Sequence, residues 1–268
     1  MADDQLFDVS NQVVLVSGGS RGIGKALARG FAARGAQVVI SGREAETLKV
    51  TAEEISVGSH PVQSVVCDVA EASQIEAAVQ QVIAECGQID TLLNVAGVNI
   101  RKPALDFTPE QFDFVLDINL RGAFLMAQHV GRHLVSRGTG SVINIDSLNS
   151  HSPLTNVTPY AMSKCGLNGM TQALAREWGP AGVRVNGLAP GFILTDLTQQ
   201  LWSDPTMLEW GRFNTPMGRL GQPEDLVGTA LFLASPAAAF LTGQTIYVDG
   251  GLISGRNWPI PGDGGQPR

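Results

Sequence analysis

Short apolar runs alternate with helical patterns along almost the whole chain. The runs are rich in β-branched residues and hold few polar ones, which is typical of strands buried on both faces of a parallel sheet. The expected strands are Val13–Val16, Val38–Ile40, Val62–Val66, Thr91–Val95, Ser141–Ile145, Val183–Leu188 and Thr245–Val248. The expected helices are Gly22–Arg34, Glu44–Val57, Ala72–Cys86, Pro109–Ser136, Pro159–Gly179 and Pro223–Ala234. This alternation predicts an α/β fold, a doubly wound parallel seven-stranded sheet with helices on both faces.

Length and composition agree with one such domain. The chain has 268 residues and shows no shift in composition, so we expect a single domain over residues 1–268. A net charge of −7 without a Lys/Arg-rich block argues against nucleic acid or a membrane as partner. The acidic N-terminus does not resemble a signal peptide, and Cys67, Cys86 and Cys165 are few and scattered. A cytoplasmic protein is therefore expected.

The turn after the first expected strand is rich in glycine. Gly18, Gly22 and Gly24 follow this strand and open the first expected helix. Glycines let the backbone approach a pyrophosphate, and a helix N-terminus offers free N–H groups and a positive dipole end. At the first βα turn of a parallel sheet, this spacing predicts dinucleotide binding in a Rossmann-type fold. The alternative is a glycine-rich turn that only closes the corner.

The end of the second expected strand favours NADP (NADPH) as the cofactor over NAD. NAD enzymes usually place an acid here for the ribose hydroxyls, but the chain has Ser41 and Gly42, followed by Arg43. Arg21 lies close by in the glycine loop. Two guanidinium groups suit a 2′-phosphate through charge-assisted hydrogen bonds. The alternative is that both are solvated surface arginines.

An ordered set of short motifs continues to the last expected strand. The motifs are Asp68-Val69, Asn94-Val95-Ala96-Gly97, Asn119, Ser147, Tyr160-x-x-x-Lys164, Pro190-Gly191 and Asp249-Gly250-Gly251. Together they resemble the short-chain dehydrogenase/reductase family, from about Val13 to Gly251. The resemblance implies a catalytic tetrad of Asn119, Ser147, Tyr160 and Lys164. With Arg43, the cofactor contacts expected are Gly18, Ser20, Arg21, Gly22, Ile23, Gly24, Asp68, Val69, Asn94, Ala96, Gly97, Tyr160, Lys164, Pro190, Gly191, Ile193 and Thr195.

Two positions depart from the family pattern. Val95 stands where the family often has a second Asn, and Asp146 stands where it often has a small residue before the catalytic Ser. Neighbouring strand residues point to opposite faces. We therefore expect Asp146 to face away from Ser147, to pair with a cation on a helix and to leave the site unaffected.

The expected chemistry follows from the residue types. Tyr160 and Lys164 are four residues apart on one helix face. An ammonium about 5 Å from the phenol is expected to lower its pKa by about two units, which suits a general acid–base. Ser147 would polarise the substrate carbonyl, and the resemblance implies that Asn119 holds a water linked to Lys164. The alternative for Tyr160 and Lys164 alone is an exposed helix pair.

The mouth of the expected site is polar and basic. The expected substrate contacts are Ser147, Asn149, Tyr160, Arg101 and His151, with Arg101 either clamping a carboxylate or lying at the rim. Residues 97–103, 117–124 and 211–225 look like the branch of the family that acts on sugar acids and polyols, such as gluconate 5-dehydrogenases. The main alternative is a 3-oxoacyl-[acyl-carrier-protein] reductase. A remote alternative is a catalytically silent NADP-binding sensor.

The C-terminal third carries two further expectations. Residues 192–219 lack strand character and carry several aromatic residues, so we expect a substrate lid. Residues 255–268 form a Gly/Pro-rich tail. His129 and His133 share a helix face but have no third ligand at useful spacing, so no metal is expected. The family resemblance implies a homotetramer.

Overall fold

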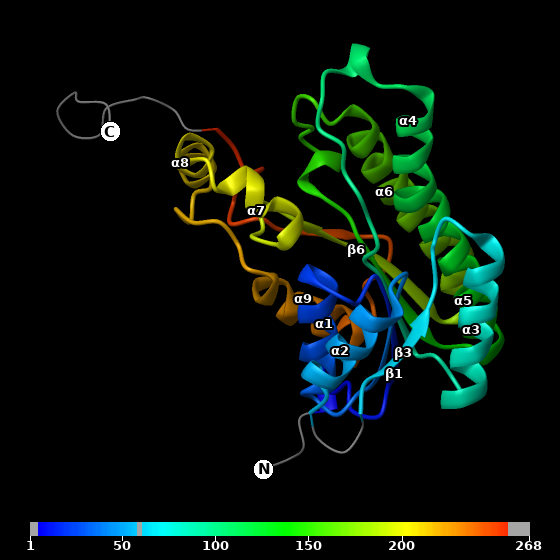
Figure 1. Cartoon of the computed structure of the whole chain (residues 1–268). Coiled ribbons are helices and arrows are strands. Elements are labelled where there is room, and N and C mark those ends of the chain that lie inside the picture. Colours follow the sequence, from blue (N-terminus) through cyan, green and yellow to red (C-terminus); the bar gives the residue numbers. More distant parts are fainter. Residues whose placement is uncertain (1–4, 58–60, 257–268) are drawn as a thin grey trace.

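One parallel sheet organises the protein. The computed structural model describes residues 5–57 and 61–256. Within them, seven strands form a sheet in the order β3-β2-β1-β4-β5-β6-β7 (Figure 1). The strands are β1 Val13–Ser17, β2 Gln37–Gly42, β3 Gln63–Val66, β4 Thr91–Asn94, β5 Gly140–Ile145, β6 Val183–Pro190 and β7 Thr245–Val248. The predicted Rossmann-type α/β fold is confirmed.

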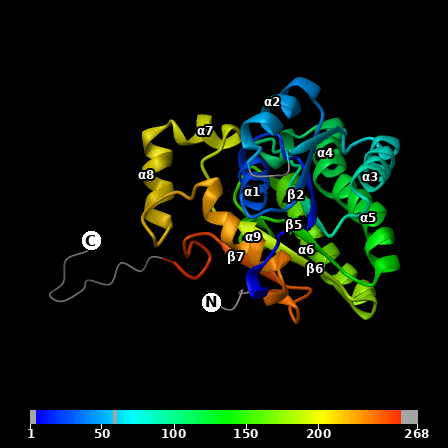
Figure 2. The ribbon, with the colours of Figure 1, turned by 90° about the horizontal axis from the view of Figure 1, so that it is seen from below.

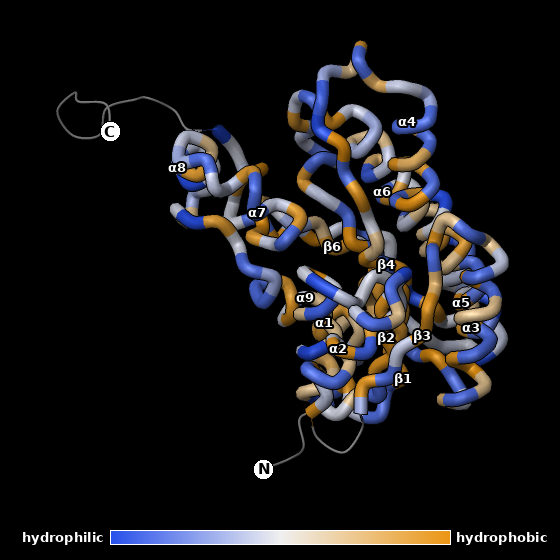
Figure 3. The backbone as a smooth tube through the Cα atoms, in the orientation of Figure 1, coloured by the Kyte–Doolittle hydropathy of each residue, from blue (hydrophilic) through white to orange (hydrophobic). Residues whose placement is uncertain are grey.

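Helices cover both faces of the sheet (Figures 1 and 2). The helices are α1 Gly22–Ala32, α2 Ala45–Ile55, α3 Ala72–Cys86, α4 Pro109–Leu116, α5 Ala123–Arg137, α6 Thr158–Trp178, α7 Asp196–Trp202, α8 Pro205–Asn214 and α9 Val227–Ala234. Buried side chains of α1, α2 and α9 pack in one core, and those of α3, α5 and α6 pack in another. Such a doubly covered sheet explains why its strands read as continuous apolar runs (Figure 3).

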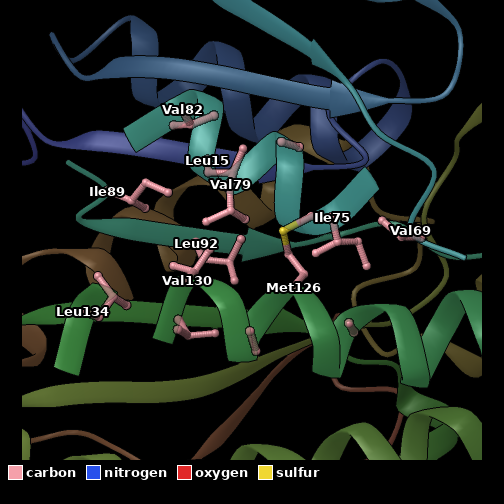
Figure 4. Packing of buried hydrophobic residues seen from close by; sticks show 14 of the residues in the cluster. Leu15, Val69, Ile75, Val79, Val82, Ile89, Leu92, Met126, Val130 and Leu134 are labelled. Carbon is pink, nitrogen blue, oxygen red and sulfur yellow. The ribbon is translucent and has the colours of Figure 1, made fainter. Parts of the chain in front are cut away.

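The core on the α3 and α5 side is built from aliphatic side chains (Figure 4). Val79 from α3 and Met126 and Val130 from α5 pack against Leu15 of β1 and Leu92 of β4, and each is at most 3% exposed. Burying each such side chain contributes about 1.5 to 3 kcal/mol. This packing fixes the central strands, whose carboxyl ends carry the site.

The expected helix over 109–136 is wrong as a single element. The structure divides it into α4, a π-helical turn η3 at Asp117–Gly122, and α5. Tertiary contacts cause the break: the Asn119 side chain is bonded to the backbone of Val98. A Cβ on Gly122 would lie 2.5 Å from the Val69 carbonyl oxygen. The predicted start of this helix at Pro109 is confirmed. Thr108 caps α4 there in a capping box.

Residues 192–219 fold as two short helices, α7 and α8, beside the sheet (Figures 1 and 2). Phe192 packs against Trp202 at 5.1 Å and Trp210 at 5.5 Å between ring centroids. Most of the predicted tail, from residue 257 on, lies outside the described residues. None of the described helices is long and apolar enough to cross a membrane.

Candidate active site

A cavity of about 450 Å³ lies at the carboxyl ends of the strands. β1 pairs with both β2 and β4, so the chain crosses over on opposite sides of β1 and leaves a crevice there. The predicted site residues that line the cavity are Gly18, Ser20, Arg21, Gly22, Ile23, Gly24, Arg43, Asp68, Val69, Ala96, Gly97, Ser147, Tyr160, Lys164, Pro190, Gly191, Ile193 and Thr195. Motifs far apart in the sequence therefore meet in one place.

The glycine loop forms a cradle that side chains would fill. Gly18 has φ +85°, and a Cβ on it would lie 2.6 Å from the backbone nitrogen of Ala96. A Cβ on Gly24 would lie 2.1 Å from the Gly18 carbonyl oxygen. The loop leads directly into α1 at Gly22, whose first N–H groups have no intrahelical partner. The residues present therefore fit a dinucleotide pyrophosphate.

Two arginines lie at the end of the cavity formed by β2 and the glycine loop. Arg21 and Arg43 are exposed, and neither guanidinium forms a hydrogen bond or an ion pair within the described part of the chain. Glu44 and Thr47 line the same end. Neither residue was among the expected cofactor contacts, although Glu44 directly follows Arg43. Two free cations suit a 2′-phosphate, whereas Glu44 would suit a ribose diol.

The other end of the cavity holds the predicted catalytic side chains. Ser147 follows β5, and Tyr160 and Lys164 lie one turn apart on α6. Lys164 is buried, and its Nζ donates to the Ile145 carbonyl oxygen at 2.6 Å. The same Nζ lies 5.7 Å from the centre of the Tyr160 ring. The β5 backbone thus fixes the ammonium beneath the phenol.

The expected lowering of the Tyr160 pKa is wrong for this structure. Burial raises the pKa of Tyr160, and the charge of Asp146 adds to the rise; a hydrogen bond with Ser147 and the charge of Arg101 oppose it. Burial also lowers the pKa of Lys164 to about 8, against the opposing effect of Asp146. Desolvation penalises the charged form of each group, which raises the pKa of the phenol and lowers that of the ammonium. For both groups it is the largest cause of the shift. At neutral pH the phenol is therefore protonated and can donate its proton to a substrate.

Asp146 corrects a second expectation. It is buried, lines the cavity and forms no direct salt bridge with any described residue; the helix cation that acts on it is the predicted catalytic Lys164 of α6, whose charge opposes the rise of the Asp146 pKa that burial causes. Its Oδ2 accepts a hydrogen bond from Asn168 at 3.4 Å. β5 ends at Ile145, so strand alternation no longer fixes where this side chain points. The charge of Asp146 acts to raise the pKa of both Lys164 and Tyr160, so this residue does affect the site.

Two predicted residues are anchored beside the cavity and are not among those lining it. Asn119 accepts from the Val98 N–H at 2.7 Å and donates to Ser163 at 3.1 Å, so it ties η3 to α6 next to Lys164. Asn94 donates to Asn144 and to a backbone carbonyl within the core. Both side chains brace the elements that form the site. The water that Asn119 is expected to hold stays a prediction.

Three of the expected substrate contacts, Arg101, Asn149 and His151, differ in their burial and in what they contact. Arg101 is exposed, and its charge reaches the Tyr160 phenol. Asn149 is buried and donates to the Ser147 Oγ. His151 is exposed and packs edge-on against Tyr247 at 5.8 Å, and it does not line the cavity. The start of α7 adds Asp196 to the cavity lining; this residue was not predicted, although it directly follows the predicted Thr195.

His129 and His133 were considered as a metal-binding pair, and no metal was expected because they have no third ligand at useful spacing. No group of three or more His, Cys, Asp or Glu able to hold a metal occurs among residues 5–57 and 61–256. His133 Nε2 accepts from the backbone N–H of Ile89 at 3.2 Å. This bond joins α5 to the segment just before β4.

Comparison with known proteins agrees with this geometry. A family model described as Enoyl-(Acyl carrier protein) reductase matches residues 18–253. Gluconate 5-dehydrogenase of Gluconobacter oxydans (strain 621H) is 37% identical over 252 residues, covering 94% of this chain and 98% of the relative. The chain belongs to the short-chain dehydrogenase/reductase family. It is an oxidoreductase that acts on hydroxyl and carbonyl groups.

Other members of the family support the same assignment. 5-keto-D-gluconate 5-reductase of Escherichia coli (strain K12) is 34% identical, covering 93% of this chain and 98% of the relative. The crystal structure of a gluconate 5-dehydrogenase from Burkholderia cenocepacia J2315 in complex with NADP and tartrate has a TM-score of 0.90 and 39% identity. It covers 94% of this chain and 98% of that one. The predicted likeness to the sugar-acid and polyol branch is confirmed.

Proposed function

We propose that the protein transfers a hydride between NADP(H) and a sugar acid or polyol, as a gluconate 5-dehydrogenase does. The observation that carries this proposal is the meeting of Ser147, Tyr160 and Lys164 with the glycine loop around one cavity. The similarity to a gluconate 5-dehydrogenase and a 5-keto-D-gluconate 5-reductase over nearly the whole chain supports the substrate class.

Each side chain has a distinct task in the proposed reaction. The bound nicotinamide supplies or accepts the hydride. In reduction, the Tyr160 hydroxyl donates its proton to the substrate oxygen, and the Ser147 hydroxyl donates a hydrogen bond to the same atom. Lys164 places a positive charge beneath the phenol as the tyrosine loses its proton. In oxidation the same steps run in reverse.

We further propose that Arg101 binds the carboxylate of the substrate. Its charge acts on the Tyr160 phenol from an exposed position outside the cavity lining, so a substrate carboxylate directed toward the mouth of the cavity would meet it. A guanidinium binds a carboxylate through two parallel hydrogen bonds. The tartrate named with NADP in the related structure is itself a hydroxylated dicarboxylate. Residues 192–219 are proposed as the lid, because the start of α7 lines the cavity.

A substrate panel tests the proposed function. We expect gluconate or 5-ketogluconate to be turned over with NADP(H), followed in nicotinamide absorbance, while an acetoacetyl thioester is not. The thioester belongs in the panel because the matching family model carries an acyl-carrier-protein reductase description. Turnover of the thioester alone would replace the proposal with a 3-oxoacyl-[acyl-carrier-protein] reductase. NADPH binding without turnover of any carbonyl would indicate a sensor.

Replacing Arg43 with Ala tests the cofactor proposal. Losing a charge-assisted hydrogen bond of about 1.5 to 3 kcal/mol is expected to raise the KM for NADP about 10- to 150-fold, with little change for NAD. Arg34→Ala is the matched control, because Arg34 follows the far end of α1. An unchanged KM for NADP after Arg43→Ala, or better activity of the natural chain with NAD, would contradict the assignment; the second result would point to Glu44 as a partner of the ribose diol.

The oligomeric state and the cellular location rest on the family and the sequence. Helices α4, α5 and α6 expose Phe114, Phe124 and Met162, which are at least 40% exposed. We propose that copies of the chain cover these side chains in a homotetramer, and the mass in solution tests this. The cytoplasmic location stays a prediction from the cysteine pattern.

A further inference from the structure

The hydroxyl of Ser147 is held by one neighbouring asparagine. The backbone N–H of Asn149 and its side-chain Nδ2 both donate to the Ser147 Oγ, each at 3.2 Å. A serine hydroxyl has two acceptor lone pairs and one O–H donor. Both acceptor positions of Ser147 are thus occupied by Asn149, and the O–H remains free to donate.

The orientation of the Asn149 amide follows from its other contact. Its Oδ1 accepts from the backbone N–H of Leu154 at 2.9 Å. An oxygen must occupy that position because the partner is a donor, so the amide nitrogen must face Ser147. Asn149 is 6% exposed and lies in the η4 turn at Leu148–Ser150. The Ser150 hydroxyl donates to the Ser147 carbonyl oxygen at 2.8 Å and holds the turn closed.

We propose that Asn149 is a positioning residue that restricts Ser147 to the role of hydrogen-bond donor toward the substrate oxygen. Without it, the Ser147 hydroxyl can rotate and accept from the substrate or from the phenol. The Ser147 hydroxyl also interacts with the Tyr160 phenol and lowers its pKa, so the two groups that would bind the substrate oxygen lie close together in the cavity. The inference rests on the proposed function, since it assigns a step in that reaction.

This role differs from the substrate contact expected for Asn149. The side chain acts through Ser147, which lines the cavity, while Asn149 does not line it. Ser147 lines the cavity together with three titratable groups, Asp146, Tyr160 and Lys164, and the charge of Arg101 acts on Tyr160. The uncharged Asn149 amide orients the hydroxyl without adding a charge to this site.

The first test is Asn149→Asp, which keeps the shape and replaces the N–H donor with a carboxylate. The Ser147 O–H is then expected to donate to the new carboxylate, and kcat for carbonyl reduction at neutral pH should fall about 10- to 100-fold. NADPH affinity, read by cofactor fluorescence, should not change. As the pH falls and the new carboxyl gains a proton, kcat should recover relative to the natural chain. Asn11→Asp is the matched control, because Asn11 is exposed in the turn before β1, at the amino ends of the strands.

A double-mutant cycle separates positioning from a general structural effect. In a Ser147→Ala background, Asn149→Asp should cause little further loss of kcat, because there is no hydroxyl left to orient. Asn149→Ala serves as a second variant without a new charge, and should lose about 5-fold in kcat, only when Ser147 is present.

Three outcomes distinguish the hypotheses. Unchanged kcat in both Asn149 variants would overturn the inference. Equal losses with and without the Ser147 hydroxyl would overturn it as well, since Asn149 would then act independently. If the natural chain turns over no sugar acid, polyol or ketone while it binds NADPH, the proposed function fails instead.

Discussion

Tyr160→Phe is expected to lower kcat for the sugar-acid or polyol substrate by about 10²- to 10⁴-fold, the usual contribution of a general acid–base. Phe keeps the ring packed beside Lys164 but has no proton to give to the substrate oxygen. Phe keeps the ring that lines the cofactor cavity and leaves the glycine loop unchanged, so NADPH binding should stay nearly the same. Steady-state kinetics and cofactor fluorescence together measure both effects.

Tyr247→Phe is the matched control for this prediction. The chain has two tyrosines, and the Tyr247 hydroxyl lies 3.3 Å from Ser150 rather than in the cavity lining. Its loss should leave kcat nearly unchanged. If Tyr160→Phe also retained its kcat, Tyr160 would not be the proton donor and the proposed mechanism would be abandoned.

The direction of the Tyr160 pKa shift determines how the two reaction directions depend on pH. Because burial raises this pKa, the phenol stays protonated at and above neutral pH and is ready for carbonyl reduction. Alcohol oxidation needs the phenolate, so its rate should rise with pH. The oxidation optimum therefore lies above the reduction optimum. At the Lys164 pKa of about 8, half of the supporting positive charge has been lost.

The sheet and the cofactor loop were predictable because they depend on local patterns. Apolar runs located all seven strands, and the glycine spacing located the loop at Gly18–Gly24. The π-helical turn was not predictable, because it depends on bonds between Asn119 and residues more than twenty positions away. No periodicity in the sequence reports such a contact.

The errors at the catalytic centre have one physical cause. The sequence shows which charged groups are near Tyr160, but it does not show how deeply they are buried. Lys164 and Asp146 are 4% and 3% exposed, so desolvation decides the direction of their pKa shifts. The interaction of Asn149 with Ser147 depends likewise on the closed η4 turn, which the sequence does not specify.

Gly24→Ala is expected to weaken cofactor binding, by up to about 150-fold in the Kd for NADPH. Its new Cβ would lie 2.1 Å from the Gly18 carbonyl oxygen, the shortest such distance for any described glycine. The obstacle is backbone, so the start of α1 or the Gly18 turn must move, and the cradle for the pyrophosphate opens. Overpacking of this kind costs about 1 to 3 kcal/mol, which at the upper end raises the Kd for NADPH about 150-fold.

The control for this prediction is Gly228→Ala in α9, where a Cβ meets nothing within 4 Å. Alanine is a better helix former than glycine by about 1 kcal/mol, so this variant should bind NADPH normally and melt no lower than the natural chain. Calorimetric titration with NADPH and thermal unfolding measure both properties. Unchanged NADPH affinity in Gly24→Ala would mean that the loop can relax without losing its cofactor contacts. The close approach of Gly24 to Gly18 would then serve helix–strand packing rather than pyrophosphate binding.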